Sequence, residues 1–334
     1  MNYILLDIWA KELKNNTFYR TVQENRFDKV LLFAMHEPYY WNMLNFYPIV
    51  EACDKQNKPL HIITSVEEYY NDIEPVELNA TFERWPTFWL NKTFGHLDLS
   101  KEFVDTEYKH HYIMMVNRAH FWRCQLLDLL GKHKLISKGA ISWHNIPKFR
   151  YDWKYTKPRI MCLSDNYHMD KQHSKVPLEY FNSFAQLVSE TSADARWITE
   201  KTVTPLMLGK PFIVAGSPYF HKMLKDWGIE LYDEIFDYSF DSIIDTEQRY
   251  DLLLKNFDEL VNHSLNDLNL LYSKIKDKIE YNKTKIFEIT ADYDNFPKTA
   301  KEVIDHYLST GISLCKVTIS NYNDLEKAKK YKIC

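Results

Sequence analysis

Glycine is rare in this chain, with only 7 in 334 residues. Phosphate-binding loops of the P-loop and dinucleotide-binding types need closely spaced glycines, and neither pattern occurs. Hydrophobic residues make up 45% of the sequence and aromatic residues 15%, so a large core can form. A chain of this length is long for one core and comfortable for two domains.

Cysteine is also sparse. The five cysteines are widely spaced, odd in number and free of any C-x-x-C pair, which argues against a zinc ribbon or a redox motif. The first residues carry neither a basic region nor a long apolar core, so they do not form a signal peptide, and no apolar run approaches the roughly 18 residues of a membrane span. We therefore expect reduced thiols in a cytoplasmic protein without a transmembrane segment, located in the host cytoplasm if the chain is viral.

An excess of positive charge is absent, because the net charge is −4 and both signs occur throughout. Duplex DNA is therefore disfavoured as the main partner, since binding its phosphates needs clustered cations. One basic stretch keeps a nucleic-acid partner open as an alternative, and it contains Lys148-Phe149-Arg150, Lys154 and Lys157-Pro158-Arg159.

Two groups of residues have the side-chain types that bind metals. Asp165, His168, Asp170 and His173 lie in a long polar stretch without a helical or hairpin frame, so chance composition explains them better than a metal site. Asp292-Tyr293-Asp294 is a D-x-D, but it follows a helical segment rather than an apolar strand. No G-x-S-x-G or H-E-x-x-H motif occurs, which weakens the case for a hydrolase. We expect no metal.

Strand-like and helix-like segments alternate along the chain and predict two α/β domains joined near residue 105. In the first, residues 29–35 and 59–64 are predicted strands, with a helical segment over 46–55 between them. This is the order of a parallel α/β unit.

The second domain is predicted to begin near residue 108. A strand over 112–116 leads through a turn into a helix that starts at Phe121 and ends at Gly131, a plausible C-cap. The further expected elements are strands at 140–143, 184–188 and 212–215, helices at 199–208 and 218–226, one long or broken helical stretch at 246–288, and a last helix at 299–308.

The most informative segment is residues 189–201, SETSADARWITEK. It places Glu200 and Lys201 side by side at the start of a predicted helix, with Trp197 three residues before the glutamate. A helix start offers unpaired N–H groups and partial positive charge to an anion, and Lys201 adds a full charge for a phosphate. Glu200 could accept from ribose hydroxyls and Trp197 could stack on a base. The alternatives are a solvated ion pair on a helix surface and a tryptophan in the core.

Residues 184–218 resemble the donor-binding signature of the α1,3-fucosyltransferase family. That signature has a strand ending in Glu-Asn-(Ser/Thr), an aromatic residue, Thr/Ser-Glu-Lys, an apolar helix, and a strand ending in Gly-Ser-Pro. The spacing from Glu190 to Lys201 fits without a gap, and Thr191 stands where the family has Asn. Upstream, residues 117–130 (NRAHFWRCQLLDLL) resemble the strand, loop and helix of the same family.

The resemblance implies a GT-B-like fold, in which two Rossmann-like domains face each other across a cleft and the C-terminal one binds the donor. We expect an acceptor-side domain over residues 1–105 and a nucleotide-sugar-binding domain over 106–290. The remaining helix and tail, 291–334, are expected to pack back on the N-terminal domain.

The resemblance also implies roles for single residues. Lys201 and Arg123 would hold the diphosphate, Glu200 the ribose, and Trp197 would lie against the base. Glu190 would face the sugar or stabilise its loop. Two fixed cations suit a nucleoside diphosphate leaving group, because they stabilise the negative charge that develops on it. Two further donor-site candidates, Asn117 and Arg118, follow a predicted strand in a loop, where binding residues are common.

Inverting transfer also needs a carboxylate or histidine that takes the proton from the acceptor hydroxyl. Glu37, directly after the predicted strand over residues 29–35, is the candidate catalytic base, although a simple turn residue explains it equally well. Glu83 and Asp98 are weaker candidates.

These residues predict a glycosyltransferase that moves a sugar from a nucleotide-diphosphate donor to a hydroxyl with inversion. By the resemblance the donor is a GDP-sugar, with a UDP-sugar as the alternative, and no cofactor is needed beyond this nucleotide-sugar co-substrate. The acceptor would be a glycan, a lipid-linked sugar or a protein. Two alternatives stay open: a transferase acting on a modified base in DNA, and a non-catalytic module that binds a nucleotide or glycan.

Overall fold

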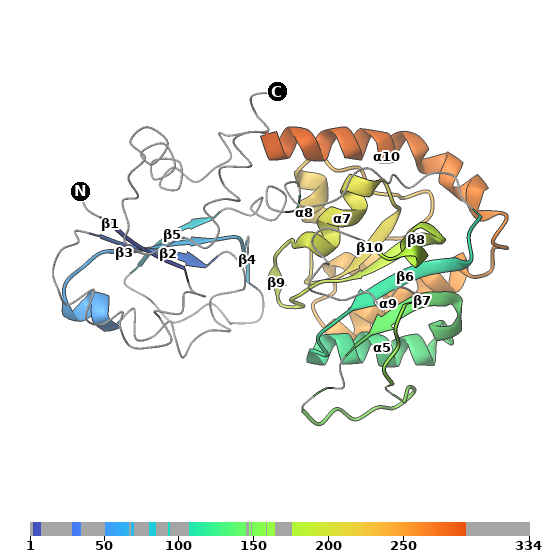
Figure 1. Cartoon of the computed structure of the whole chain (residues 1–334), viewed down its shortest axis with the longest axis horizontal. Helices are drawn as coiled ribbons and strands as arrows, with labels where there is room; N and C mark the ends of the chain where they lie inside the picture. The colour runs from blue at the N-terminus through green and yellow to red at the C-terminus, as the bar shows by residue number, and fades with distance from the viewer. Residues whose placement is uncertain are drawn as a thin grey trace. The chain divides into compact units, whose positions relative to one another are not determined.

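The computed structural model describes residues 3–7, 29–34, 51–66, 68–69, 80–84, 93, 107–144, 147, 149–157, 159–163 and 176–291. The chain divides into two compact units. One comprises Met1–Gly95 with Ile289–Cys334, and the other comprises His96–Glu288. Figure 1 shows the labelled elements of both.

The first unit is built on a four-stranded parallel sheet with the order β1-β2-β3-β5. Every residue of β3 is buried, as expected for a strand covered on both faces. The strands predicted over 29–35 and 59–64 are confirmed, and residues 51–55 between them are helical. Two strands of the sheet, β1 and β5, have no counterpart in the sequence prediction. The strands of this unit are β1 (Tyr3–Asp7), β2 (Lys29–Ala34), β3 (Leu60–Thr64), the two-residue β4 (Glu68–Tyr69) and β5 (Ala80–Arg84).

The second unit has its own four-stranded parallel sheet, with the order β10-β8-β6-β7. All four predicted strands are confirmed. The central strand β8 is buried along its whole length, and its sequence SFAQLVS is the nearly continuous apolar run typical of such a position. The strands are β6 (His110–Val116), β7 (Gly139–Trp143), β8 (Ser183–Ser189) and β10 (Phe212–Ala215), with a two-residue strand β9 (Ala195–Arg196) outside this sheet.

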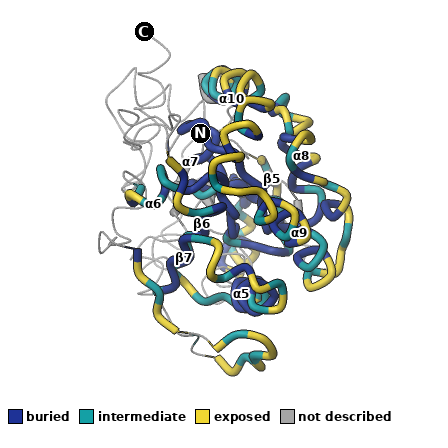
Figure 2. The backbone as a smooth tube through the Cα atoms, turned by 90° about the vertical axis from the view of Figure 1, so that its right-hand side faces the viewer, coloured by how far each residue is buried: buried dark blue, intermediate teal, exposed yellow. Residues whose placement is uncertain are grey.

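Helices cover both faces of this sheet. In Figure 1, α7, α8 and α10 lie on one side of it and α5 and α9 on the other, and Figure 2 shows β6 and β7 in the buried interior. The helical stretch predicted over 246–288 is broken into α9 and α10. The helices are α5 (Phe121–Lys132), α6 (Leu178–Phe181), α7 (Glu200–Leu208), α8 (Phe220–Asp226), α9 (Thr246–Leu260) and α10 (Leu268–Ala291), with short 3₁₀ turns η2 (Ile136–Lys138) and η4 (Ser239–Ser242).

Gly131 does not cap α5, which corrects the prediction. The helix continues to Lys132, and His133 is the C-cap. A Cβ atom on Gly131 would lie 2.0 Å from Thr156 Oγ1 and 2.9 Å from the Tyr155 carbonyl oxygen. The glycine therefore permits the close approach of residues 155–156 to the helix.

Asp128 on α5 also holds residues 154–156 close to this helix. Its buried carboxylate accepts hydrogen bonds from the backbone N–H groups of Lys154, Tyr155 and Thr156 at 2.9, 2.8 and 2.7 Å. Thr156 Oγ1 donates to the Leu127 carbonyl at 3.2 Å. Residues 154–156 are thus held firmly against the helix.

The chain order places β6 and β8 at a switch point of the second sheet. From β6 the chain passes through α5 to β7 on one side, and from β8 it passes through α7 to β10 on the other. In open parallel sheets, ligands bind outside the carboxyl ends of the strands at such a point. The fold therefore indicates the ends of β6 and β8 as the place for a site.

The α/β class with parallel sheets is confirmed in both units. Opposed domains across a cleft, and the boundaries at 105 and 290, stay predictions. None of the helices within the described ranges is long and apolar enough to cross a membrane.

Candidate functional site

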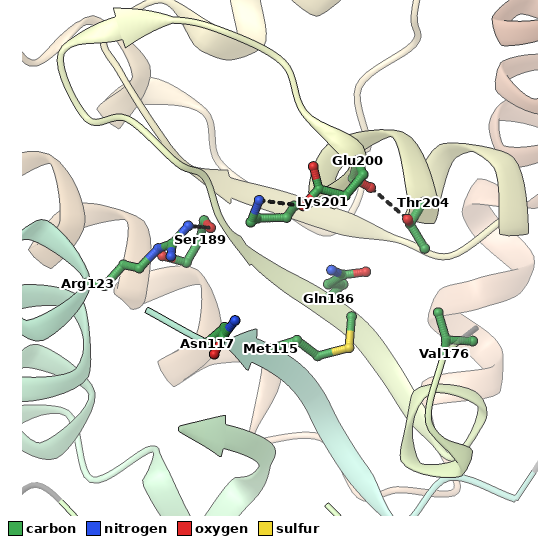
Figure 3. Close-up of a pocket in the computed structure, with 9 residues that line it drawn as sticks. All are labelled: Met115, Asn117, Arg123, Val176, Gln186, Ser189, Glu200, Lys201 and Thr204. Atoms are coloured by element: carbon green, nitrogen blue, oxygen red, sulfur yellow. Dashed lines mark hydrogen bonds and ion pairs between the residues drawn. The ribbon is translucent and has the colours of Figure 1, made fainter. Parts of the chain in front are cut away.

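A pocket lies at this switch point of the second unit (Figure 3). It is formed by the ends of β6 and β8, the first turns of α7 and the segment before α6. Thr199 caps α7 and accepts from the backbone N–H of Lys201 at 3.4 Å, while Gly209 ends the helix in the left-handed conformation with φ 70°. The residues that line the pocket are Met115, Asn117, Arg123, Val176, Gln186, Ser189, Glu200, Lys201 and Thr204.

Lys201 supplies one positive charge in the first turn of α7. Its Nζ donates to Glu200 Oε1 at 2.6 Å, to Thr191 Oγ1 at 3.0 Å and to Thr199 Oγ1 at 3.3 Å. The side chain is 23% exposed. Thr191, which stands where the resembled family has Asn, provides an oxygen to this lysine.

Arg123 supplies a second positive charge from the first turn of α5. It is 3% exposed and donates to the carbonyl oxygens of Arg118 at 3.1 Å, Glu190 at 3.2 Å and Ser189 at 3.4 Å. Burial lowers the pKa of its guanidinium to about 10, while the carboxylates of Glu190 and Glu200 act in the opposite direction. Arg123 thus stays charged at neutral pH and ties the loop after β6 to the end of β8.

The positive charges of this region act on His120, the N-cap residue of α5. Burial lowers the pKa of His120 to about 4, and the charges of Arg123, Arg118 and Lys201 contribute to this shift. Its ring stacks on Trp122 at 4.9 Å between centroids and 7° between planes. His120 is therefore neutral at physiological pH and leaves the positive charge of the region to the other three residues.

Glu190 organises the loop behind the pocket. It is fully buried, and its carboxylate accepts from Thr199 N–H and Oγ1 and from Thr202 Oγ1 at 3.1, 2.7 and 2.7 Å. The backbone N–H of Thr191 donates to it at 2.9 Å. These four bonds fasten the end of β8 to the start of α7, which corresponds to the loop-stabilising alternative for Glu190.

Three polar atoms of pocket-lining residues are buried without a hydrogen-bond partner in the described part of the protein. They are Arg123 Nε, Gln186 Oε1 and Ser189 Oγ. A buried polar group without a partner is costly, so most such groups in native proteins are paired with protein, water or ligand. Their convergence on one pocket that also holds two cations indicates a site for an anionic ligand with further polar groups.

The structure brings four predicted residues together in this pocket, namely Asn117, Arg123, Glu200 and Lys201. Arg118 is exposed and contributes its carbonyl oxygen to Arg123. The remaining pocket-lining residues were missed by sequence reasoning: Met115, Val176, Gln186, Ser189 and Thr204. Of these, Gln186 had a usable signal, because it is the one polar residue inside the apolar run of residues 184–188.

Trp197 lies elsewhere. Its side chain is 1% exposed and does not line the pocket, so it belongs to the core in this structure, where it offers no face to a base. The candidate base Glu37 lies outside the described residues, and so does Asp98. Glu83 lies on β5, where His61 Nε2 is 2.8 Å from Glu83 Oε2.

The ranges that the structure covers contain no group of three or more His, Cys, Asp or Glu residues placed to hold a metal ion. The acidic and histidine group over residues 165–173 and the D-x-D at 292–294 fall outside these ranges.

No family model and no curated protein matches the chain. Among solved structures, it is similar to a mutant of T4 phage BGT in complex with UDP-glucose. The TM-score is 0.35 and the sequence identity 13%, over 85% of this chain and 82% of that chain.

Proposed function

We propose that this protein is a glycosyltransferase that takes a sugar from a nucleotide-diphosphate donor and passes it to a hydroxyl group. The observation that carries the proposal is the pocket at the β6–β8 switch point, where Arg123 and Lys201 converge with the start of α7. This arrangement suits a diphosphate, because two cations and the positive end of the helix dipole all favour negative charge. Residues 184–218 resemble a donor-binding signature, which supports a nucleotide sugar as the molecule that contains this diphosphate.

In the proposed reaction the acceptor oxygen attacks the anomeric carbon of the sugar, and the bond from that carbon to the phosphate oxygen breaks. The electron pair leaves with the nucleoside diphosphate. Lys201 and Arg123 stabilise the negative charge that develops there, so metal is not required for this step. The acceptor proton passes to a base, for which Glu37 remains the candidate. Attack from the face opposite the leaving group inverts the anomeric centre.

A GDP-sugar is the favoured donor, and a UDP-sugar is the alternative. This preference rests on the resemblance of residues 184–218. A thermal-shift screen of the whole chain against GDP, UDP, dTDP, CMP and their sugars tests it, because a ligand that binds the native state raises the melting temperature. The proposal expects the largest shift with GDP or a GDP-sugar. An unchanged melting temperature with every one of these compounds would contradict the transferase assignment.

A specific surface favours a second acceptor class, a modified base in DNA. Arg150, Lys154, Lys157 and Arg159 are all exposed, and the exposed Phe149 directly precedes Arg150. Asp128 holds part of this segment in place through residues 154–156. Binding of DNA that weakens steeply between 50 and 200 mM salt would favour this acceptor, since cation contacts to phosphates release counterions. Salt-independent or absent binding would favour a glycan, lipid-linked or protein acceptor.

A non-catalytic binding module is separated from a transferase by the fate of the bound donor. A transferase is expected to release free nucleoside diphosphate from a bound nucleotide sugar, by transfer to an acceptor or slowly to water. A module that only binds would leave the nucleotide sugar intact during prolonged incubation.

A further inference from the structure

The pocket has two chemically different ends. At one end Arg123 and Lys201 present positive charge, and Ser189 presents a hydroxyl group. At the other, Met115 and Gln186 lie on the neighbouring strands β6 and β8, with Val176 and Thr204 beyond them (Figure 3). The strand register pairs Ile113 with Gln186, so Met115, two residues further on, is on the same face of the sheet as Gln186.

Gln186 is the unusual residue of this second end. It is 2% exposed, and its Oε1 has no hydrogen-bond partner among the residues that the structure describes. Its neighbours along β8 are Ala185 and Leu187, both fully buried. A buried amide oxygen without a partner costs stability that an apolar side chain of similar size avoids. No group in the described structure donates to this oxygen, and because Gln186 lines the pocket, a ligand bound there can supply the donor.

The unpartnered Oε1 of Gln186 needs a hydrogen-bond donor, which an ionised phosphate does not offer. An amide oxygen is an acceptor and repels phosphate oxygens. The cations lie at the other end. A ligand that satisfies both ends carries its phosphates toward Arg123 and Lys201 and an uncharged hydrogen-bond donor toward Gln186.

We propose that Gln186 is a specificity residue of this pocket and that its side-chain amide accepts a hydrogen bond from an uncharged N–H or O–H group attached to the diphosphate. The N–H of a nucleobase edge and the O–H of a sugar share this chemistry. Met115, Val176 and the methyl group of Thr204 provide the apolar wall that surrounds this hydrogen bond. The inference rests on the proposed nucleotide-sugar function and adds which residue selects the ligand.

Gln186→Met tests the proposal, because methionine has a similar size and shape but no amide. Gln125→Met, on α5 outside the pocket, is the matched control. Binding of GDP, UDP, their sugars and inorganic pyrophosphate is measured by titration calorimetry for all three proteins. The melting temperature without ligand is measured as well.

The proposal expects Gln186→Met to weaken binding of the preferred nucleotide or nucleotide sugar by about tenfold or more, the size of one buried hydrogen bond. Binding of pyrophosphate stays unchanged. The melting temperature without ligand rises, because the unpaired buried oxygen is removed. A loss already seen with the free nucleoside diphosphate assigns the bond to the nucleoside, whereas a loss confined to the nucleotide sugar assigns it to the transferred sugar.

Two results overturn the proposal while leaving the function intact. One is unchanged affinity of Gln186→Met for every nucleotide and nucleotide sugar that the parent protein binds. The other is an equal loss for pyrophosphate, which would show a general disturbance of the pocket. If the parent protein binds none of the nucleotides, the proposed function fails and the inference fails with it.

Discussion

Glu190 and Thr199 are joined twice. The backbone N–H of Thr199 donates to Glu190 Oε1 at 3.1 Å, and Thr199 Oγ1 donates to Glu190 Oε2 at 2.7 Å. Thr199 is also the N-cap of α7, so the carboxylate at the end of β8 fixes the position at which this helix begins. Glu200 and Lys201 then enter the pocket from the first turn.

Glu190→Gln is expected to destabilise the protein by about 1.5–3 kcal/mol, because an amide NH₂ replaces an oxygen that accepts hydrogen bonds in a fully buried place. Nucleotide affinity is expected to fall as well, since the start of α7 loses its anchor. Urea unfolding measures the first effect and calorimetric titration the second. Glu259→Gln, at an exposed position of α9, is the control and is expected to change neither. Parental stability of Glu190→Gln would contradict the anchoring role.

Gly131→Ala is expected to destabilise the protein by about 1–3 kcal/mol, the usual range for overpacking. Alanine is the better helix former by about 1 kcal/mol, so helix propensity alone predicts the opposite sign. The reason for the loss is steric, because the added methyl group would meet Thr156 Oγ1 and the Tyr155 carbonyl. The free energy of unfolding in urea decides between the two. A more stable variant would show that residues 155–156 do not pack closely on α5.

His120 is expected to make folding sensitive to pH in the acid range. Its pKa is about 4 in the folded protein, where burial and nearby cations lower it from the ordinary value of 6.5. Between these values the unfolded chain binds a proton that the folded protein does not, so stability falls as the pH is lowered from about 6.5 to about 4.

The variant His120→Gln removes this titration. Its free energy of unfolding is expected to decline less than that of the parent between pH 7 and pH 4.5. Carboxylates titrate in both proteins, so the difference between the two pH profiles isolates His120. Parallel profiles would show that the pKa of His120 is not lowered in the folded protein.

Much of the second unit could be predicted because its elements carry local signals. The apolar run in β8, the capping Thr199 and the left-handed Gly209 mark one strand and one helix without reference to the rest of the chain. Gly131 was misjudged for the opposite reason. The residues that forbid a side chain there, 155 and 156, are more than twenty positions away, and no local pattern reports such an approach.

The candidate site could be predicted for residues whose position in a helix or strand determines where the side chain points. Lys201 and Glu200 occupy the first turn of a helix at a sheet edge, and this position brings them to the pocket. Trp197 precedes that helix in a loop, where only tertiary packing decides whether an indole faces the core or a ligand, and it faces the core. Gln186 was missed because the sequence does not show whether a polar residue within an apolar strand faces a pocket. That depends on its neighbours in space.

The central claim is that the pocket at the start of α7 binds a nucleoside diphosphate, and Lys201→Met tests it most directly. Lys222→Met, on α8 outside the pocket, is the matched control. Calorimetric titration with GDP and UDP is expected to show binding by the parent and by Lys222→Met. A loss of about ten- to a hundredfold is expected for Lys201→Met, the size of one hydrogen bond to a charged group. Equal affinity of Lys201→Met and the parent for the nucleotide would contradict the account.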